Sequence, residues 1–98
     1  MLGELIPLAG GETIRLLKQE TLIGRRDDCD VVLRFATVSA HHCRLTLKLF
    51  RWHVEDLGSA NGVKVNDRRC WTEQQLDPDD VLTNADHQFR IRYFPPPS

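Results

Sequence analysis

The chain has 98 residues, of which 41% are hydrophobic, so it has the length and apolar content of one small domain with a single core. Its formal net charge is −1, from 13 basic and 14 acidic residues, and this balance disfavours a nucleic-acid-binding or membrane-surface protein, which would normally carry a basic excess. No apolar run approaches the length that spans a bilayer, and residues 1–5 lack the basic region and long apolar core of a signal peptide.

The three cysteines, Cys29, Cys43 and Cys70, are widely spaced and odd in number. A disulfide framework usually needs an even number, so we expect free thiols and a cytoplasmic or other reducing compartment. Cys29, Cys43, His41 and His42 are close in sequence, but they lack the Cys-x-x-Cys and His-x(3–5)-His pairs of zinc sites. We therefore predict buried thiols, no metal ion and no cofactor.

Apolar and polar residues alternate in short runs through the N-terminal half, which is typical of strands. The runs are separated by the Gly10-Gly11 turn and by two polar loops at residues 25–30 and 34–40. We expect strands at residues 4–8, 13–18, 21–23, 31–33 and 43–48.

The C-terminal half begins with an unusual hairpin tip, Leu49-Phe50, where Gly, Asn or Asp is common. These two residues are either a small partner-binding patch or side chains that fold back over the edge of the core. Residues 71–76 are expected to form one helical turn or a loop. We expect strands at residues 52–55, 63–65, 81–82 and 89–93.

About ten short strands with turn signals every eight to twelve residues predict an all-β sandwich or barrel. Two sheets packed face to face would bury Leu45, Trp52, Val54, Phe89 and Ile91 between them. The proline-rich residues 95–98 read as a tail or the start of a linker. We therefore expect the domain at residues 1–94, as a monomeric module within a larger chain.

The polar stretch Asp-Leu-Gly-Ser-Ala-Asn-Gly, residues 56–62, joins two of the expected strands. Asn61-Gly62 is a strong turn signal because both residues tolerate positive φ, and Gly58 adds a second flexible point. We expect an ordered loop that presents Ser59 and Asn61 at the tip of a sheet.

Polar groups that suit an anion occur in three loops, at Gly24-Arg25, at residues 39–42 and at residues 59–62. Loops cluster at the two ends of a β-sandwich, so all three can converge at one end. An arginine fork matches a phosphate in a bidentate manner, and serine hydroxyls and loop N–H groups can complete the shell. The sequence therefore predicts an anion-recognition site.

Four segments follow one another in a distinctive order: Ile-Gly-Arg at residues 23–25, Cys-Asp-Val-Val-Leu at 29–33, Val-Ser-Ala-His-His at 38–42, and the polar stretch at 56–62. In this order and spacing they resemble the forkhead-associated (FHA) domain, and the resemblance runs from about Leu16 to Tyr93. It implies an FHA-like β-sandwich of two twisted, mostly antiparallel sheets with about eleven short strands. It also implies a non-catalytic interaction module in a signalling or regulatory protein, which binds phosphothreonine peptides.

The resemblance gives roles to individual residues of this chain. Arg25 would hold the phosphate, Ser39 would donate its hydroxyl to it, and Asn61 would bond the peptide backbone beside the phosphothreonine. The structural residues would be Gly24, Gly58 and Gly62, which set loop geometry, His42, which ties the Ser39 loop to its neighbours, and Asn66, which caps the next turn.

Two alanines depart from the family pattern. Ala40 stands where the family often has arginine, lysine or asparagine, and Ala60 stands where it usually has threonine. Both usual residues would contact phosphate, and each charge-assisted hydrogen bond is worth roughly 1.5–3 kcal/mol, so losing two would weaken binding by about ten- to a thousandfold. The candidates for remaining rim contacts are the backbone N–H groups of Ala40 and Ala60 and the side chains of Arg26, His41 and Lys64.

Three alternatives stay open at this point. Ser39 or Cys43 beside a histidine, with Asp56, supplies the residue types of a nucleophilic enzyme. Adjacent strand residues point to opposite faces and no nucleophile elbow is present, so we predict no enzyme activity. The alanine departures also allow an FHA-like domain that binds a protein partner without phosphate dependence, through its loops or a sheet face. Arg25 could also be a surface residue paired with Asp27 or Asp28.

Overall fold

Eleven strands and no helix make up residues 1–97, which are the residues that this computed structural model describes; Ser98, the last residue of the expected tail, lies outside them. The all-β prediction is confirmed. The strands are β1 (Gly3–Pro7), β2 (Ile14–Leu16), β3 (Glu20–Gly24), β4 (Val31–Val32), β5 (Cys43–Lys48), β6 (Arg51–Asp56), β7 (Val63–Val65), β8 (Arg68–Arg69), β9 (Gln74–Leu76), β10 (Val81–Asn84) and β11 (His87–Arg92).

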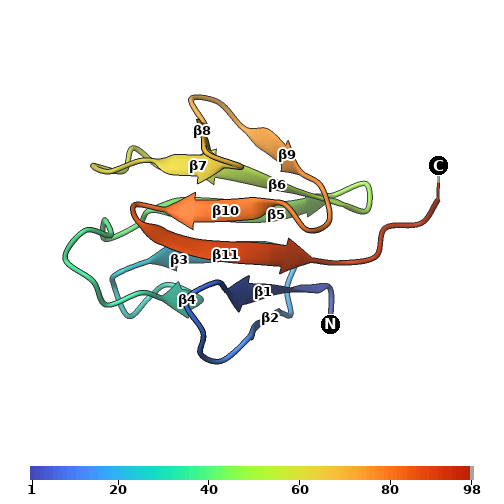
Figure 1. Cartoon of the computed structure of the whole chain (residues 1–98), viewed down its shortest axis with the longest axis horizontal. Coiled ribbons are helices and arrows are strands. Elements are labelled where there is room, and N and C mark those ends of the chain that lie inside the picture. Colours follow the sequence, from blue (N-terminus) through green and yellow to red (C-terminus); the bar gives the residue numbers. More distant parts are fainter. Residues whose placement is uncertain (98) are drawn as a thin grey trace.

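The strands form two sheets packed face to face, as the sandwich prediction required (Figure 1). One sheet has six strands in the order β2-β1-β11-β10-β7-β8, and the other has five in the order β4-β3-β5-β6-β9. The neighbouring strands are antiparallel except β3 and β4, which run parallel with Ile23 opposite Val31. Residues 1–97 contain no helix that is long and apolar enough to span a bilayer.

The core lies between the two sheets, where side chains of alternate strand residues meet. In β5 and β6, Leu45 lies opposite Val54 and Leu47 opposite Trp52. The five residues that the alternation placed in the core, Leu45, Trp52, Val54, Phe89 and Ile91, are all buried.

Two strands of the C-terminal half were missed by the sequence reasoning. Residues 74–76 form β9, with Leu76 opposite Trp52, so the expectation of a helical turn or a loop was wrong there. Gln-Gln-Leu has little intrinsic preference for a strand, and pairing with β6 decides its conformation. The two-residue strand β8 follows a tight turn at Asn66-Asp67, where φ is 50° and 68°.

The three polar loops lie at the same end of the sandwich. The β3–β4, β4–β5 and β6–β7 connections gather at the left in Figure 1, and both chain termini lie at the right. This arrangement follows from the strand directions, because β3, which is antiparallel to β5, ends where β5 begins and where the antiparallel β6 ends. The fold thus brings together segments that are far apart in sequence.

Candidate functional site

Hydrogen bonds join the three loops that carry Arg25, Ser39 and Asn61. The Arg25 N–H donates to the Ser39 carbonyl at 3.0 Å and to the Ala40 carbonyl at 3.1 Å. The Ala60 N–H donates to Ser39 Oγ at 2.9 Å. Asn61 Nδ2 donates to the Thr37 carbonyl at 2.7 Å. The structure therefore brings the three predicted site residues together at one end of the domain.

His42 is fully buried among these loops. Its Nδ1 accepts the Ser39 N–H at 3.1 Å, and its Nε2 lies 2.8 Å from the Gly62 carbonyl. A carbonyl can only accept, so these two partners require the neutral tautomer with its proton on Nε2. The ring thus connects the β4–β5 loop to the β6–β7 loop.

The structure shows why glycine is needed at two loop positions: at one because a side chain would clash, and at the other because of the backbone conformation. A Cβ at Gly24 would lie 2.2 Å from the Ala40 carbonyl oxygen and 2.8 Å from Cys29 Sγ, so only glycine lets β3 approach the β4–β5 loop this closely. Gly58 has φ near 79° and nothing within 4 Å of a Cβ, so its reason is the left-handed backbone alone.

The Arg25 side chain is exposed, and it makes no ion pair with the described residues. The alternative pairing with Asp27 or Asp28 is not formed. Asp27 pairs with Arg34, and Asp28 accepts a hydrogen bond from His41 Nε2, 2.9–3.0 Å from the two carboxylate oxygens. This bond holds the pKa of Asp28 below its ordinary value. Arg25 therefore keeps its donors available for an incoming anion.

The Ser59 side chain is half-buried and is used within its own loop, so it is not presented to a ligand as the sequence suggested. Its N–H donates to Asp56 Oδ1 at 2.8 Å, and its Oγ accepts the Gly62 N–H at 2.9 Å. Both contacts shape the β6–β7 loop from within. The role of Asp56 was missed, although an Asp three residues before a Ser is a signal for such a local side-chain-to-backbone turn. Only Asn61 of the two remains exposed.

Some of the predicted rim contacts are already bonded within the domain, and others are exposed. The Ala60 N–H is taken by Ser39 Oγ, so it is not available to a ligand as the sequence reasoning had supposed. His41 is held by Asp28. Arg26 is exposed beside Arg25, and Lys64 is exposed on β7.

Asn66 lies in the β7–β8 turn and bonds to the turn that precedes β10, the neighbouring strand of β7. Its Nδ2 donates to Asp80 Oδ1 and its Oδ1 accepts the Val81 N–H, both at 2.9 Å. It therefore ties its own turn to residues 77–80 at the start of β10.

The residue types of a nucleophilic enzyme are present but not assembled. Cys43 is fully buried, its thiol donates to Asn84 Oδ1 at 3.0 Å, and burial raises its pKa. His42 contacts the Ser39 backbone, while Ser39 Oγ bonds to Ala60. The side chains thus lack the nucleophile-to-base contact that such chemistry needs.

One group of potential metal ligands occurs beside Arg25. One donor atom each of Asp28, Cys29 and His41 lies within 4.8 Å of the others. Burial raises the pKa of the Cys29 thiol, so the thiolate that binds metals is disfavoured. Of the three, Asp28 also lines a hollow with Arg25, Arg26 and Arg34, whose positive charges disfavour a bound cation there.

Several hollows mark the described surface. A shallow one of about 350 Å³ is lined by Arg25, Arg26, Asp27, Asp28 and Arg34, and does not reach Ser39 or Asn61. A second, of about 470 Å³, includes Phe35 and His87, whose rings stack at 4.0 Å.

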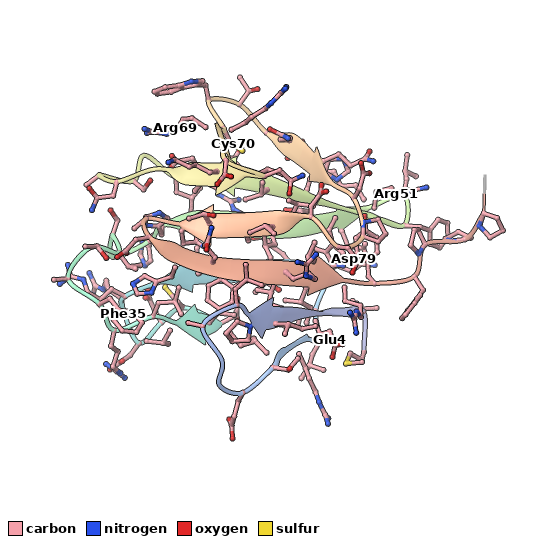
Figure 2. The ribbon with its side chains drawn as sticks, viewed as in Figure 1. Glu4, Phe35, Arg51, Arg69, Cys70 and Asp79 are labelled. Atoms are coloured by element: carbon pink, nitrogen blue, oxygen red, sulfur yellow. The ribbon has the colours of Figure 1, made fainter. Side chains whose placement is uncertain are left out.

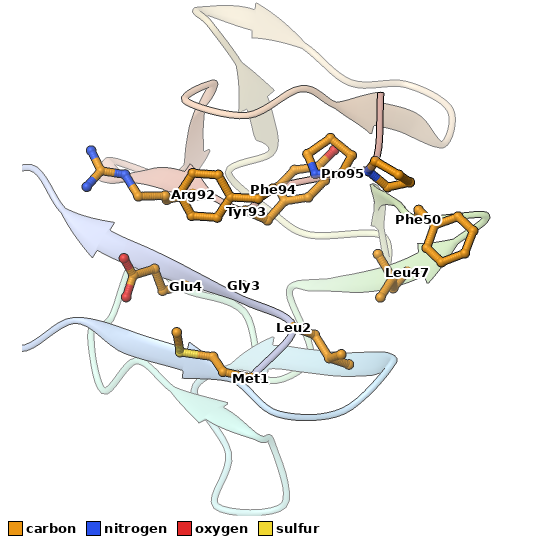
Figure 3. Close-up of a pocket in the computed structure, with 11 residues that line it drawn as sticks. Met1, Leu2, Gly3, Glu4, Leu47, Phe50, Arg92, Tyr93, Phe94 and Pro95 are labelled. Carbon is orange, nitrogen blue, oxygen red and sulfur yellow. The ribbon is translucent and has the colours of Figure 1, made fainter. Parts of the chain in front are cut away.

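The third hollow, of about 280 Å³, lies at the opposite end of the domain, beside both termini (Figure 3). Phe50 lines it together with Leu47 and Leu2, while Leu49 is 92% exposed and does not fold back over the core. The reading of Leu49 and Phe50 as a partner-binding patch stays a prediction.

The family model described as the FHA domain matches residues 21–83, well over half of the chain. The chain belongs to the FHA-domain family. The match covers all three loops and His42. The resemblance drawn from the sequence motifs is therefore confirmed.

Relatives in Mycobacterium tuberculosis share this domain. The chain is 42% identical over 62 residues to the FHA domain-containing protein FhaB, covering 63% of this chain and 40% of FhaB. It is 35% identical over 85 residues to the transcriptional regulatory protein EmbR, covering 87% of this chain and 22% of EmbR. The chain thus spans less than half the length of these relatives.

Solved FHA structures have the same fold. M. tuberculosis EmbR, solved in complex with a low-affinity phosphopeptide, superposes with a TM-score of 0.90 and 31% identity, over 98% of this chain and 25% of that chain. An FHA domain from a study of phosphothreonine-dependent FHA interactions superposes with a TM-score of 0.86 and 29% identity, over 95% and 97% of the two chains.

Proposed function

We propose that this FHA domain is a phosphothreonine-peptide-binding module of a signalling or regulatory protein, and not an enzyme. Arg25 holds the phosphate, Ser39 donates its hydroxyl proton to it, and Asn61 bonds the peptide main chain. The observation that carries the proposal is the exposed Arg25 guanidinium, without an acidic partner among residues 1–97, on a loop bonded to Ser39.

The hydrogen bonds of the site support this assignment. Ser39 Oγ accepts the Ala60 N–H, so its own proton is left to donate to a phosphate oxygen. Asn61 uses Nδ2 within the domain, so its Oδ1 can accept a peptide N–H. A phosphothreonine carries about −1.5 to −2 charge near pH 7, which suits the exposed guanidinium of Arg25.

The affinity should be modest. Ala40 and Ala60 lack side chains that can contact phosphate, and the Ala60 N–H is already bonded. We therefore expect a dissociation constant in the micromolar range or weaker, on the order of −8 kcal/mol at best. The EmbR domain, which superposes well on this chain, was itself solved with a low-affinity phosphopeptide.

The alternative is a domain that binds a protein partner without phosphate dependence. The two alanines favour it, because each removes a potential phosphate contact. The alternative predicts equal binding of phosphorylated and unphosphorylated peptides.

Isothermal titration against an oriented phosphothreonine peptide pool and its unphosphorylated twin decides between the two. We expect binding that requires the phosphate and disappears in Arg25→Ala. Arg51→Ala, on β6 away from the three loops, is the matched control for loss of one surface guanidinium, and it should bind like wild type. A folded domain that shows no phosphate-dependent binding across the pool would refute the proposal.

The boundaries of the domain, its oligomeric state and its cellular compartment are also proposals. We place the domain at residues 1–94, because Tyr93 is buried and the proline-rich residues 95–98 follow Phe94. We propose a monomeric module of a larger chain, in a cytoplasmic or other reducing compartment where Cys29, Cys43 and Cys70 remain free thiols.

A further inference from the structure

Asn61 is the only asparagine of the sequence that is followed by glycine. In such a pair the backbone nitrogen of the glycine can attack the side-chain carbonyl carbon of the asparagine, because glycine has no Cβ to hinder the approach. Asparagine is among the thermolabile residues of proteins. The exposed side chain of Asn61 therefore makes this loop a candidate for spontaneous chemical modification.

The reaction at this pair needs only water. The Gly62 nitrogen loses its proton and forms a bond to Cγ of Asn61, while the bond from Cγ to Nδ2 breaks and Nδ2 takes up a proton and leaves as ammonia. Water then opens the resulting cyclic succinimide at either of its carbonyl carbons, which leaves an aspartate or an isoaspartate in place of the asparagine. Either product carries one more negative charge than asparagine at neutral pH.

Hydrogen bonds of the folded loop keep the two reacting groups in place. The Gly62 N–H donates to Ser59 Oγ at 2.9 Å, and Asn61 Nδ2 donates to the Thr37 carbonyl at 2.7 Å. A hydrogen bond donated by a neutral N–H group disfavours loss of its proton. The attack therefore requires the Gly62 N–H to leave Ser59, and a rotation of the Asn61 side chain breaks its bond to Thr37.

The backbone of Gly62 is restrained on its other side as well. Its carbonyl accepts hydrogen bonds from the Ala85 N–H at 3.0 Å and from His42 Nε2 at 2.8 Å. A Cβ at Gly62 would lie 2.5 Å from Cζ of Arg69, so this guanidinium packs directly on the glycine backbone. Figure 2 shows Arg69 at the upper margin of the domain, next to Cys70. The glycine is thus held at its carbonyl as well as at its N–H.

We propose that Asn61 is a site of spontaneous deamidation, and that Ser59 restrains the reaction. Ser59 acts through the Gly62 N–H, so it is a positioning residue. One net intramolecular hydrogen bond corresponds to about a two- to tenfold change in the population of the reactive loop conformation. The bonds to Ser59 and Thr37 together should make the folded domain react about five- to a hundredfold more slowly than the same segment in an unfolded peptide.

Deamidation should weaken phosphopeptide binding, and this consequence rests on the proposed function. The product lacks the Nδ2 donor that bonds to the Thr37 carbonyl. It also carries a carboxylate in the loop bonded to Ser39, and this charge repels a phosphate. An isoaspartate lengthens the main chain by one methylene group, which displaces the loop. The chemistry that removes the amide does not restore it, so the chemical stability of Asn61 limits how long the site works.

Mass spectrometry of the aged domain tests the inference. Trypsin cleaves after Arg51 and Lys64 and releases residues 52–64, in which Asn61 is the only side-chain amide. The folded domain and a synthetic peptide of residues 52–64 are incubated in parallel at neutral and at mildly alkaline pH, and an unaged sample corrects for reaction during the digest. We expect the domain to react about five- to a hundredfold more slowly than the peptide. Both should react faster at alkaline pH, because the attacking nitrogen must lose its proton.

Variants test whether Ser59 is the restraint. Ser59→Ala removes the acceptor of the Gly62 N–H and should speed the reaction about two- to tenfold, whereas Ser59→Thr keeps a hydroxyl acceptor and should react like wild type. Thr72→Ala removes an exposed hydroxyl outside the loop. Ile6→Ala weakens the packing of β1 and controls for a general loss of stability. Both controls should react like wild type, and far-UV circular dichroism checks that every variant is folded.

The outcomes separate this inference from the proposed function. A wild-type domain that reacts as fast as the peptide, or a Ser59→Ala variant that reacts no faster than wild type, would overturn the inference. Asn61→Asp reproduces one product, and it should bind the phosphothreonine peptide pool about three- to tenfold more weakly than wild type. Equal binding would overturn the consequence for the site. Absence of phosphate-dependent binding in the unmodified domain would refute the proposed function and leave the deamidation of Asn61 standing.

Discussion

The ring of His42 donates to the Gly62 carbonyl at 2.8 Å, and its other nitrogen accepts the Ser39 N–H at 3.1 Å. One buried side chain thus sets the distance between the loop of Ser39 and the loop of Asn61. The proposed site depends on this distance, because in it the phosphate and the peptide backbone are contacted together. We expect His42 to act on both stability and binding.

Replacing this histidine should destabilise the whole domain. His42→Ala leaves the Ser39 N–H without its partner, removes one of the two hydrogen bonds to the Gly62 carbonyl, which keeps the Ala85 N–H, and creates a cavity. The free energy of unfolding should therefore fall by about 2–4 kcal/mol. Urea denaturation measures the change. His53→Ala is the control, because His53 is only half-buried on β6 and should cost less than about 1 kcal/mol. Equal losses at the two positions would contradict the role assigned to His42.

Neutralising Asp28 should tighten phosphopeptide binding. Asp28 lies in the arginine-lined hollow, and its carboxylate also holds His41 Nε2. Asp28→Asn removes a negative charge that repels phosphate and weakens the bond to His41, so we expect about two- to fivefold higher affinity at pH 7. Titration of the same phosphothreonine peptide into both proteins measures this. Glu73→Gln, which removes an acid paired with Lys48 away from the loops, should change the affinity little.

The stability of the domain should fall in acid partly through Asp30. The Leu22 N–H donates to Asp30 Oδ2 at 2.8 Å and Lys18 bonds to the other oxygen, and these contacts hold the pKa of Asp30 below 3.8. Because the pKa is lower in the folded state, the stabilisation is present above pH 3.8 and is lost as the pH falls through the folded pKa.

Asp30→Asn tests this pH dependence. The difference in unfolding free energy between wild type and Asp30→Asn should be largest near pH 7 and should shrink toward about pH 2. Glu12→Gln, in the exposed β1–β2 turn, is the control for loss of one carboxylate. A difference that stays constant with pH would show that Asp30 acts only through its shape.

Substitutions in the Leu49-Phe50 turn should stabilise the domain. Both residues have positive φ, 49° and 66°, and such a backbone costs a bulky L-residue roughly 1–2 kcal/mol. Replacing them by Asn and Gly, the favoured pair for a two-residue hairpin, should raise the unfolding free energy by about 1–2 kcal/mol. Denaturation of the double variant measures this. A loss of stability instead would mean that the packing of Phe50 beside Leu47 outweighs the backbone strain.

Much of the fold was readable from the sequence, because alternation and turn residues are local signals. The clean alternation of Cys43, Leu45 and Leu47 predicted β5, and Asn61-Gly62 predicted the loop after β6. Strand β9 was missed because Gln74 and Gln75 carry no local preference, and pairing with β6 decides their conformation.

The site itself was predicted less completely. The motifs named Arg25, Ser39 and Asn61, and the loops that carry them do converge. The motifs could not tell that Ser59 turns inward or that the Ala60 N–H is already used, because both depend on which hydrogen bonds the folded loops choose among several partners. The packing of the Arg69 guanidinium on Gly62 also depends on the tertiary structure, and no local sequence signal predicts it.

Both termini lie at the end of the domain opposite the three loops (Figure 1), and the chain, its C-terminal tail included, extends 39 Å along its longest axis. Anything fused to either terminus would thus be held a few nanometres from a captured ligand, without blocking its entry. When the loops bind a ligand, the local concentration near that ligand rises for anything fused to the opposite end of the domain. The reach and stiffness of the attached linker, more than the contacts at the loops, would then set how strongly the two are coupled.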